Sequence, residues 1–67
     1  MTLDEFAKVM ENEDELLIRF WDANMNMMRN VEDDNRHRFI ENHGNLEVTR
    51  IIAGSFRIVV QIHNPFN

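Results

Sequence analysis

The sequence predicts an α+β fold in which two N-terminal helices pack on a small antiparallel β-sheet. The first half, residues 1–34, has apolar residues at helical spacing and ten acidic against three basic residues. The second half has two segments, 46–52 and 56–63, in which apolar and polar residues alternate as they do in strands. With 67 residues and no cysteine, the chain has room for a single domain, residues 1–67, without disulfide support.

A short first helix is expected at residues 3–11. Thr2 and Glu5 have the spacing of a capping box, in which each side chain accepts a hydrogen bond from a free amide at the helix start. Leu3 and Phe6 then recur at helical spacing, so one side of this helix is apolar.

A second helix is expected at residues 13–31, because Asn12 and Glu15 repeat the capping spacing. No Gly or Pro enforces a break at Asn12, so one bent helix is the alternative. The polar residues of 13–31 form one narrow stripe: Glu15, Arg19, Asp22, Asn26 and Arg29. Nearly every other residue is apolar, and an apolar arc this wide exceeds what one small sheet covers.

The C-terminal β-hairpin is expected from strands 46–52 and 56–63, around a three-residue loop in which Gly54 supplies a positive φ. The register that follows from this loop pairs Ile52 with Phe56, Val48 with Val60 and Leu46 with Ile62. All six side chains then point to one face. Arg50 falls on the same inward face, where an unpaired charge is costly.

Residues 36–42 fit either a third strand or a third short helix that ends at Gly44. We favour the strand, because a two-stranded hairpin alone is marginally stable and a third strand makes a usable sheet. In that arrangement Glu41 lies on the inward side, where it can neutralise Arg50; the alternatives are that Arg50 reaches out beside the helix or that the register differs.

The outward face of this three-stranded sheet is the first candidate binding surface. It contains Arg36, Arg38, Arg57 and His63, on a chain whose net charge is −5. Such a face suits an acidic protein or a phosphate backbone, although arginines on an exposed strand also serve solubility. Exposed aromatic side chains for base stacking are missing from it, so we expect a protein partner ahead of nucleic acid.

The second helix provides the other candidate surface. Trp21, Met25 and Met28 lie on its wide apolar arc, half of which the domain core explains. Methionine adapts readily to different partners. We therefore expect these three residues to form a homodimer contact or to bind another protein.

No catalytic motif is present. Ser55 is the only serine and falls in the hairpin loop, and a chain with two glycines has neither a P-loop nor a dinucleotide fingerprint. His37 and Glu41 have the spacing to share a metal on a helix, but such a pair alone does not define a zinc site. We expect no enzyme, no cofactor and no metal, with a histidine–metal enzyme as the least favoured function.

The chain is expected to be cytoplasmic and not to bind a membrane. Residues 1–8 lack the pattern of a signal peptide, and the longest apolar runs are far too short to span a bilayer. The absence of cysteine is compatible with a reducing compartment.

The predicted function is that of a small non-catalytic protein that binds another macromolecule, a protein by preference, as an inhibitor, adaptor or regulatory subunit. Viruses and mobile elements encode inhibitors of similar size and charge, which is an analogy and not a property of these residues. The alternative is a nucleic-acid-binding regulator that uses the arginine-bearing sheet face.

Overall fold

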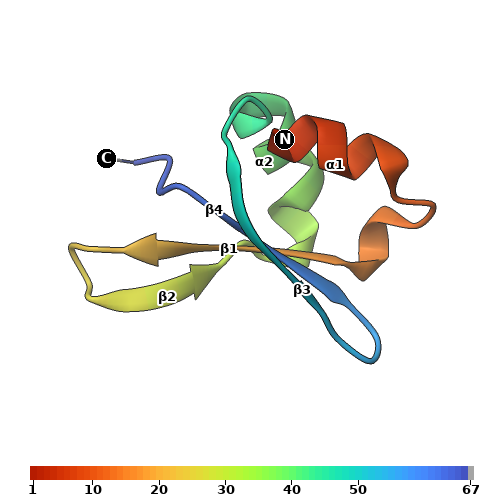
Figure 1. Ribbon diagram of the computed structural model, residues 1–67. Coiled ribbons are helices and arrows are strands. Elements are labelled where there is room, and N and C mark those ends of the chain that lie inside the picture. The colour runs from red at the N-terminus through yellow and green to blue at the C-terminus, as the bar shows by residue number, and fades with distance from the viewer. Residues whose placement is uncertain (67) are drawn as a thin grey trace.

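A four-stranded mixed sheet with two helices on one of its faces makes up the fold (Figure 1). The structure is a computed structural model, and it describes residues 1–66. The elements, with η for a single turn of 3-10 helix, are α1 (Leu3–Val9), η1 (Glu13–Glu15), β1 (Leu16–Asp22), β2 (Met27–Asn30), η2 (Asp33–Asn35), α2 (Arg36–His43), β3 (Val48–Ala53) and β4 (Ile58–Ile62). The strand order is β2-β1-β4-β3, with β1 parallel to β4 and the two outer pairs antiparallel.

Helix α1 forms where the capping box predicts it. The Thr2 hydroxyl accepts a hydrogen bond from the Glu5 amide, and the Glu5 carboxylate accepts one from the Thr2 amide. The helix ends at Val9, slightly earlier than expected, and buries Leu3 and Phe6 against the sheet. The predicted first helix is therefore confirmed.

The predicted second helix, residues 13–31, is wrong. Asn12 does act as a cap, but it caps only η1, where its Oδ1 accepts a hydrogen bond from the Asp14 amide at 3.1 Å. Along β1 every second residue is buried and its neighbours are less so, which is the period of a strand. Ile18, Phe20 and other β-branched or aromatic residues favour that conformation. The apolar residues of 16–22 thus belong to a strand with apolar side chains on both faces.

A tight turn after β1 leads into β2, and Asp22 organises it. The Asp22 carboxylate is buried and accepts hydrogen bonds from the amides of Asn24 and Met25 and from Arg29 Nη1. Asn26 adopts a left-handed φ of 53°, which asparagine tolerates better than most residues. These contacts explain why the chain reverses here instead of continuing as a helix.

The predicted third strand at 36–42 is wrong, and the helical alternative is correct, because this segment forms α2 and is followed by Gly44. Phe39 and Ile40 of α2 pack against the core. The hairpin does not need this segment for support, since β1 and β2 supply the additional strands. The two helices are therefore separated in the sequence by β1 and β2, and are not both N-terminal.

The C-terminal hairpin exists, but its predicted register is wrong. Ala53 lies opposite Ile58 and Ile52 opposite Val59, so the connecting loop has four residues, 54–57. Gly54 does not adopt a positive φ; its amide donates to the Arg57 carbonyl at 2.8 Å. Phe56 consequently lies in the loop, where it is 89% exposed.

The core lies between the helices and one face of the sheet, which we call the covered face. Leu16, Ile18, Phe20, Val60 and Ile62 of the two central strands are buried there beneath α1 and α2. The expectation of a purely antiparallel sheet is also wrong, because β1 and β4 run parallel through this core. The turn after β1 and the loop before β4 therefore lie at opposite ends of the sheet (Figure 1).

Candidate functional site

Among residues 1–66, no helix packs on the second face of the sheet, which we call the open face. Since successive side chains of a strand alternate between faces, the buried residues of β1 identify those that point away from the helices. The cross-strand register extends the assignment to the other strands. The open face comprises Leu17, Arg19 and Trp21 of β1, Met28 and Asn30 of β2, Arg50 and Ile52 of β3, and Val59 and Gln61 of β4.

The register arranges these side chains in three rows across the sheet. The first row is apolar and contains Leu17, Val59 and Ile52. The middle row is polar and contains Asn30, Arg19, Gln61 and Arg50. The third row pairs Trp21 with Met28, which are 44% and 38% exposed. Two apolar rows thus enclose a basic one.

A β-bulge at Thr49 places Arg50 on this face. Val48 lies opposite Ile62 and faces the core, whereas Arg50 lies opposite Gln61, so one residue between them is extra. The Thr49 hydroxyl donates to the Gln61 carbonyl at 3.1 Å and holds the bulge in place. An extra residue in a strand moves the side chains that follow it to the opposite face of the sheet. The predicted inward position of Arg50, beside Glu41, is therefore wrong.

The two arginines of the middle row form no ion pair with any of residues 1–66. Arg19 Nη2 makes one long contact, 3.5 Å, to Gln61 Oε1, and Arg19 Nε is buried without an acceptor. A buried donor without a partner costs free energy in the unbound protein. The positive charge of the middle row is therefore not neutralised within residues 1–66, which favours an anionic group beside it.

Negative charge is absent from the open face. None of its nine residues is Asp or Glu, although the chain has twelve acidic residues. The only carboxylate within the four strands is Asp22, which is buried and bonded to Arg29 and the turn amides. The charge of the open face is thus opposite in sign to that of the molecule as a whole, whose net charge is −5.

A hollow of about 350 Å³ opens at the end of the sheet where β1 and β4 finish. It is lined by Trp21, Thr49, Gln61, Ile62, His63 and Asn64. The lining combines an exposed indole, an imidazole and amide groups, which suits a side chain with both apolar and polar atoms.

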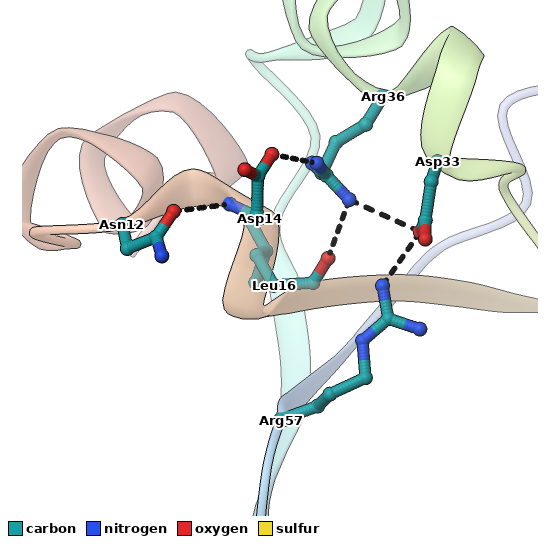
Figure 2. A network of polar contacts seen from close by, with 6 residues as sticks. All are labelled: Asn12, Asp14, Leu16, Asp33, Arg36 and Arg57. Atoms are coloured by element: carbon teal, nitrogen blue, oxygen red, sulfur yellow. Dashed lines mark hydrogen bonds and ion pairs between the residues drawn. The ribbon is translucent and has the colours of Figure 1, made fainter.

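Arg36, predicted to lie on a binding face, is instead a buried residue at the centre of a polar network on the helix side (Figure 2). Its guanidinium is bonded to Asp14 Oδ1 at 2.8 Å, to Asp33 Oδ1 at 3.1 Å and to the Leu16 carbonyl at 3.3 Å. These contacts join η1, η2, α2 and the start of β1. Because all three acceptors belong to the chain itself, Arg36 is unavailable to a partner in this arrangement.

Arg57 belongs to the same network, since its Nη2 bonds Asp33 Oδ1 at 2.6 Å (Figure 2). The hydrogen bond and charge of Arg57, with the charge of Arg36, lower the pKa of the Asp33 carboxyl below its usual value of 3.8. Arg38 lies on α2 and is exposed. The three arginines of the predicted binding face are thus on the helix side or in the loop before β4.

The other predicted site residues lie at the hollow end of the sheet. Trp21 and Met28 face each other across β1 and β2, and His63 is exposed beside them and lines the hollow. Met25 is in the turn between the two strands and is exposed. Trp21, Met28 and His63 are therefore brought together, although they come from two strands and the segment after β4, not from a helix.

The sequence reasoning missed Arg19, Arg50 and the apolar row beside them. Reading residues 16–22 with the period of a strand places Leu17, Arg19 and Trp21 on one face, so that part of the signal is present in the sequence. The position of Arg50 depends on the bulge, for which the sequence has no comparable signal.

The described residues bear on two sequence predictions, which concern a histidine–metal pair and a membrane-spanning segment. Within residues 1–66 no group of three or more His, Cys, Asp or Glu side chains is placed to hold a metal ion. His37 and Glu41 do pair on α2, at 3.1 Å, but both are well exposed and no third ligand joins them. Among the same residues, no helix combines the length and apolar character needed to cross a membrane.

Comparison of the sequence with protein-family models and with curated proteins, and of the structure with solved structures, finds no match.

Proposed function

We propose that the chain is a non-catalytic interaction protein that binds a protein partner through the open face of its sheet. The observation that supports this most directly is the composition of that face. It combines Trp21, Met28 and two arginines with aliphatic residues and has no carboxylate. Aromatic residues, Met and Arg are enriched at protein–protein interfaces, and Trp and Arg dominate their binding energy.

A protein partner fits this face better than nucleic acid does. A protein that binds a phosphate backbone neutralises several phosphates with clustered Lys and Arg, and only Arg19 and Arg50 lie here. Single-stranded nucleic acid also needs several stacking aromatics, and Trp21 is the only aromatic residue among the nine. Four of the six residues other than Trp21 and the two arginines are apolar, which matches protein side chains.

The biological roles that agree with this activity are those of an inhibitor, an adaptor or a regulatory subunit, acting in the cytoplasm. The homodimer expected from the sequence was inferred from the arc of a helix that the structure does not contain. It stays a prediction, which light scattering at micromolar concentration tests by separating the 8.0 kDa chain from a species of twice that mass.

Affinity capture with two matched variants tests the proposed function. Met28→Glu places a charge in the third row of the open face, whereas Val9→Glu makes a similar change at an exposed position on α1. We expect the unmodified chain and Val9→Glu to retain the same protein from nuclease-treated extract of the native cell, and Met28→Glu to lose it. Circular dichroism checks that both variants fold.

Equal retention by all three chains would show that the open face is not the binding surface. Retention of DNA or RNA at low salt, lost steeply as salt is added and abolished by Met28→Glu, would instead support the nucleic-acid-binding alternative.

A further inference from the structure

We infer that the open face recognises an acidic segment of its partner, in which carboxylates are flanked by apolar side chains. This inference rests on the proposed function and specifies the chemistry of the partner. The middle row of the face is basic, and an apolar row lies on each side of it. Neighbouring rows are two residues apart along each strand, or about 7 Å.

The charge of the middle row determines what can lie across it. Arg19 and Arg50 stand on β1 and β3, on either side of Gln61 of β4, so their backbones are about 10 Å apart. Neither arginine is ion-paired within residues 1–66, and Arg19 Nε is a buried donor that lacks an acceptor. A carboxylate accepts hydrogen bonds from the terminal nitrogens of a guanidinium in pairs, and its charge would neutralise that of either arginine.

A second copy of this chain does not supply that group face to face. In a two-fold symmetric dimer the same surface patch lies on both subunits, so two middle rows would meet. Each row contributes arginines and no acid, and like charges placed opposite one another across an interface are costly. The carboxylates must therefore come from a different surface, and we assign them to another protein.

The apolar rows and the hollow determine what accompanies the carboxylates. The row of Leu17, Val59 and Ile52 forms an aliphatic surface on one side of the arginines. On the other side, Trp21, which lies opposite Met28, borders the hollow of about 350 Å³, which has room for an apolar side chain of the partner. A segment in which acidic residues lie between apolar ones matches all three rows.

Trp21 is the only tryptophan of the chain, so its fluorescence reports directly on occupancy of the open face. The probes are three short synthetic peptides with the same leucine positions and with glutamate, glutamine or lysine at the positions between them. We expect the glutamate peptide to shift Trp21 emission, to bind at least about tenfold more tightly than the other two, and to weaken as salt is added.

Two matched charge reversals complete the experiment. Arg50→Glu reverses a charge on the open face, and Arg38→Glu makes the same change on exposed α2. We expect Arg50→Glu to weaken the glutamate peptide about tenfold and to strengthen the lysine peptide, while Arg38→Glu leaves both within about twofold. Arg50→Gln, which removes the charge without reversing it, should lie between the unmodified chain and Arg50→Glu.

Equal binding of the three peptides, no emission change with any of them, or equal effects of Arg50→Glu and Arg38→Glu would each overturn the inference. So would a single-stranded oligonucleotide that binds more tightly than the glutamate peptide. These failures are distinct from failure of the proposed function, because retention of the cellular partner and its loss in Met28→Glu do not depend on the charge of the partner.

Discussion

The two faces of the sheet differ in composition although they are built from alternate residues of the same strands. On the covered face Leu16 and Ile18 are buried beneath the helices, whereas the residues that follow each of them, Leu17 and Arg19, lie on the open face. Both faces have apolar residues, but only the covered face has two helices to bury them. Successive residues of such a strand alternate between the core and the proposed binding surface. Substitutions at neighbouring positions should therefore differ in their effects on stability and on binding.

The arginines show the same contrast. Arg36, on the helix side, is 7% exposed and has three acceptors within the chain. Arg19, on the open face, has one long contact and a buried Nε without an acceptor. The internal contacts of Arg36 are thus complete, whereas those of Arg19 are not.

The largest difference is expected between Leu16→Ala and Leu17→Ala, which make the same change on opposite faces of β1. Leu16 is fully buried, so its truncation should lower the free energy of unfolding by about 2–5 kcal/mol, the range found for buried leucines. A domain of this size has about 3–5 kcal/mol in total, so Leu16→Ala is expected to be largely unfolded. Leu17→Ala should cost less than about 1.5 kcal/mol. Urea unfolding followed by circular dichroism measures both.

Leu16→Met provides a milder change at the same buried site if Leu16→Ala does not fold. Equal losses for Leu16→Ala and Leu17→Ala would mean that the open face is also covered in the isolated protein, for example by a second chain.

An intermediate difference is expected between Arg36→Met and Arg19→Met. Removing Arg36 leaves the Leu16 carbonyl without its side-chain partner and disconnects η1 from η2, which should cost about 1–3 kcal/mol. Arg19→Met removes a poorly satisfied donor, so it should lower stability by no more than about 0.5 kcal/mol and is expected to raise it. Thermal unfolding of the two variants compares them directly, and a larger loss for Arg19→Met would contradict the difference between the two faces.

The smallest effect on stability is expected when the pH is lowered. The pKa of Asp33 is lowered chiefly by the hydrogen bond from Arg57, so its carboxylate favours the folded state above its ordinary pKa, near pH 4. That contribution is lost as the pH falls through the lower pKa of the folded protein. The effect is small because Asp33 is 58% exposed and water screens the pair.

Unfolding midpoints in urea, measured between neutral pH and pH 3, should therefore fall less steeply for Asp33→Asn than for the unmodified chain. Part of the slope should remain in Asp33→Asn, because the pKa values of Asp4 and Glu5 are also lowered, chiefly by hydrogen bonds with Thr2. An unchanged slope in Asp33→Asn would show that the pair with Arg57 does not persist in solution.

Local signals in the sequence predicted part of this structure correctly. The capping box at Thr2 identified α1, and the alternation of residues 46–63 identified a hairpin, because both features depend on neighbours in the chain. The sequence pattern of residues 16–22 predicts a helix, because a strand with apolar side chains on both faces has the same composition as the wide apolar arc of a buried helix. The cap at Asn12 was real, but a cap alone does not determine how far a helix extends.

Other features depend on contacts that no local pattern contains. The parallel pairing of β1 with β4 joins distant segments, and the helical state of residues 36–43 depends on the packing of Phe39 and Ile40 against the core. The bulge at Thr49 reverses the direction of Arg50, so the candidate site could not be assembled from the sequence even with the hairpin identified. The sequence pattern predicts that Trp21 and Met28 share a helix surface, whereas in the structure they lie opposite each other on β1 and β2.

During folding, the centre of the sheet should form last. Arg19 and Gln61 lie side by side across the β1–β4 pair but are 42 residues apart in the chain, whereas each hairpin closes through a short turn. The two hairpins therefore meet along a single seam, with Arg19 on one and Arg50 on the other. The basic row exists only after the seam has closed, so a partner that requires both arginines would discriminate against chains whose folding is incomplete.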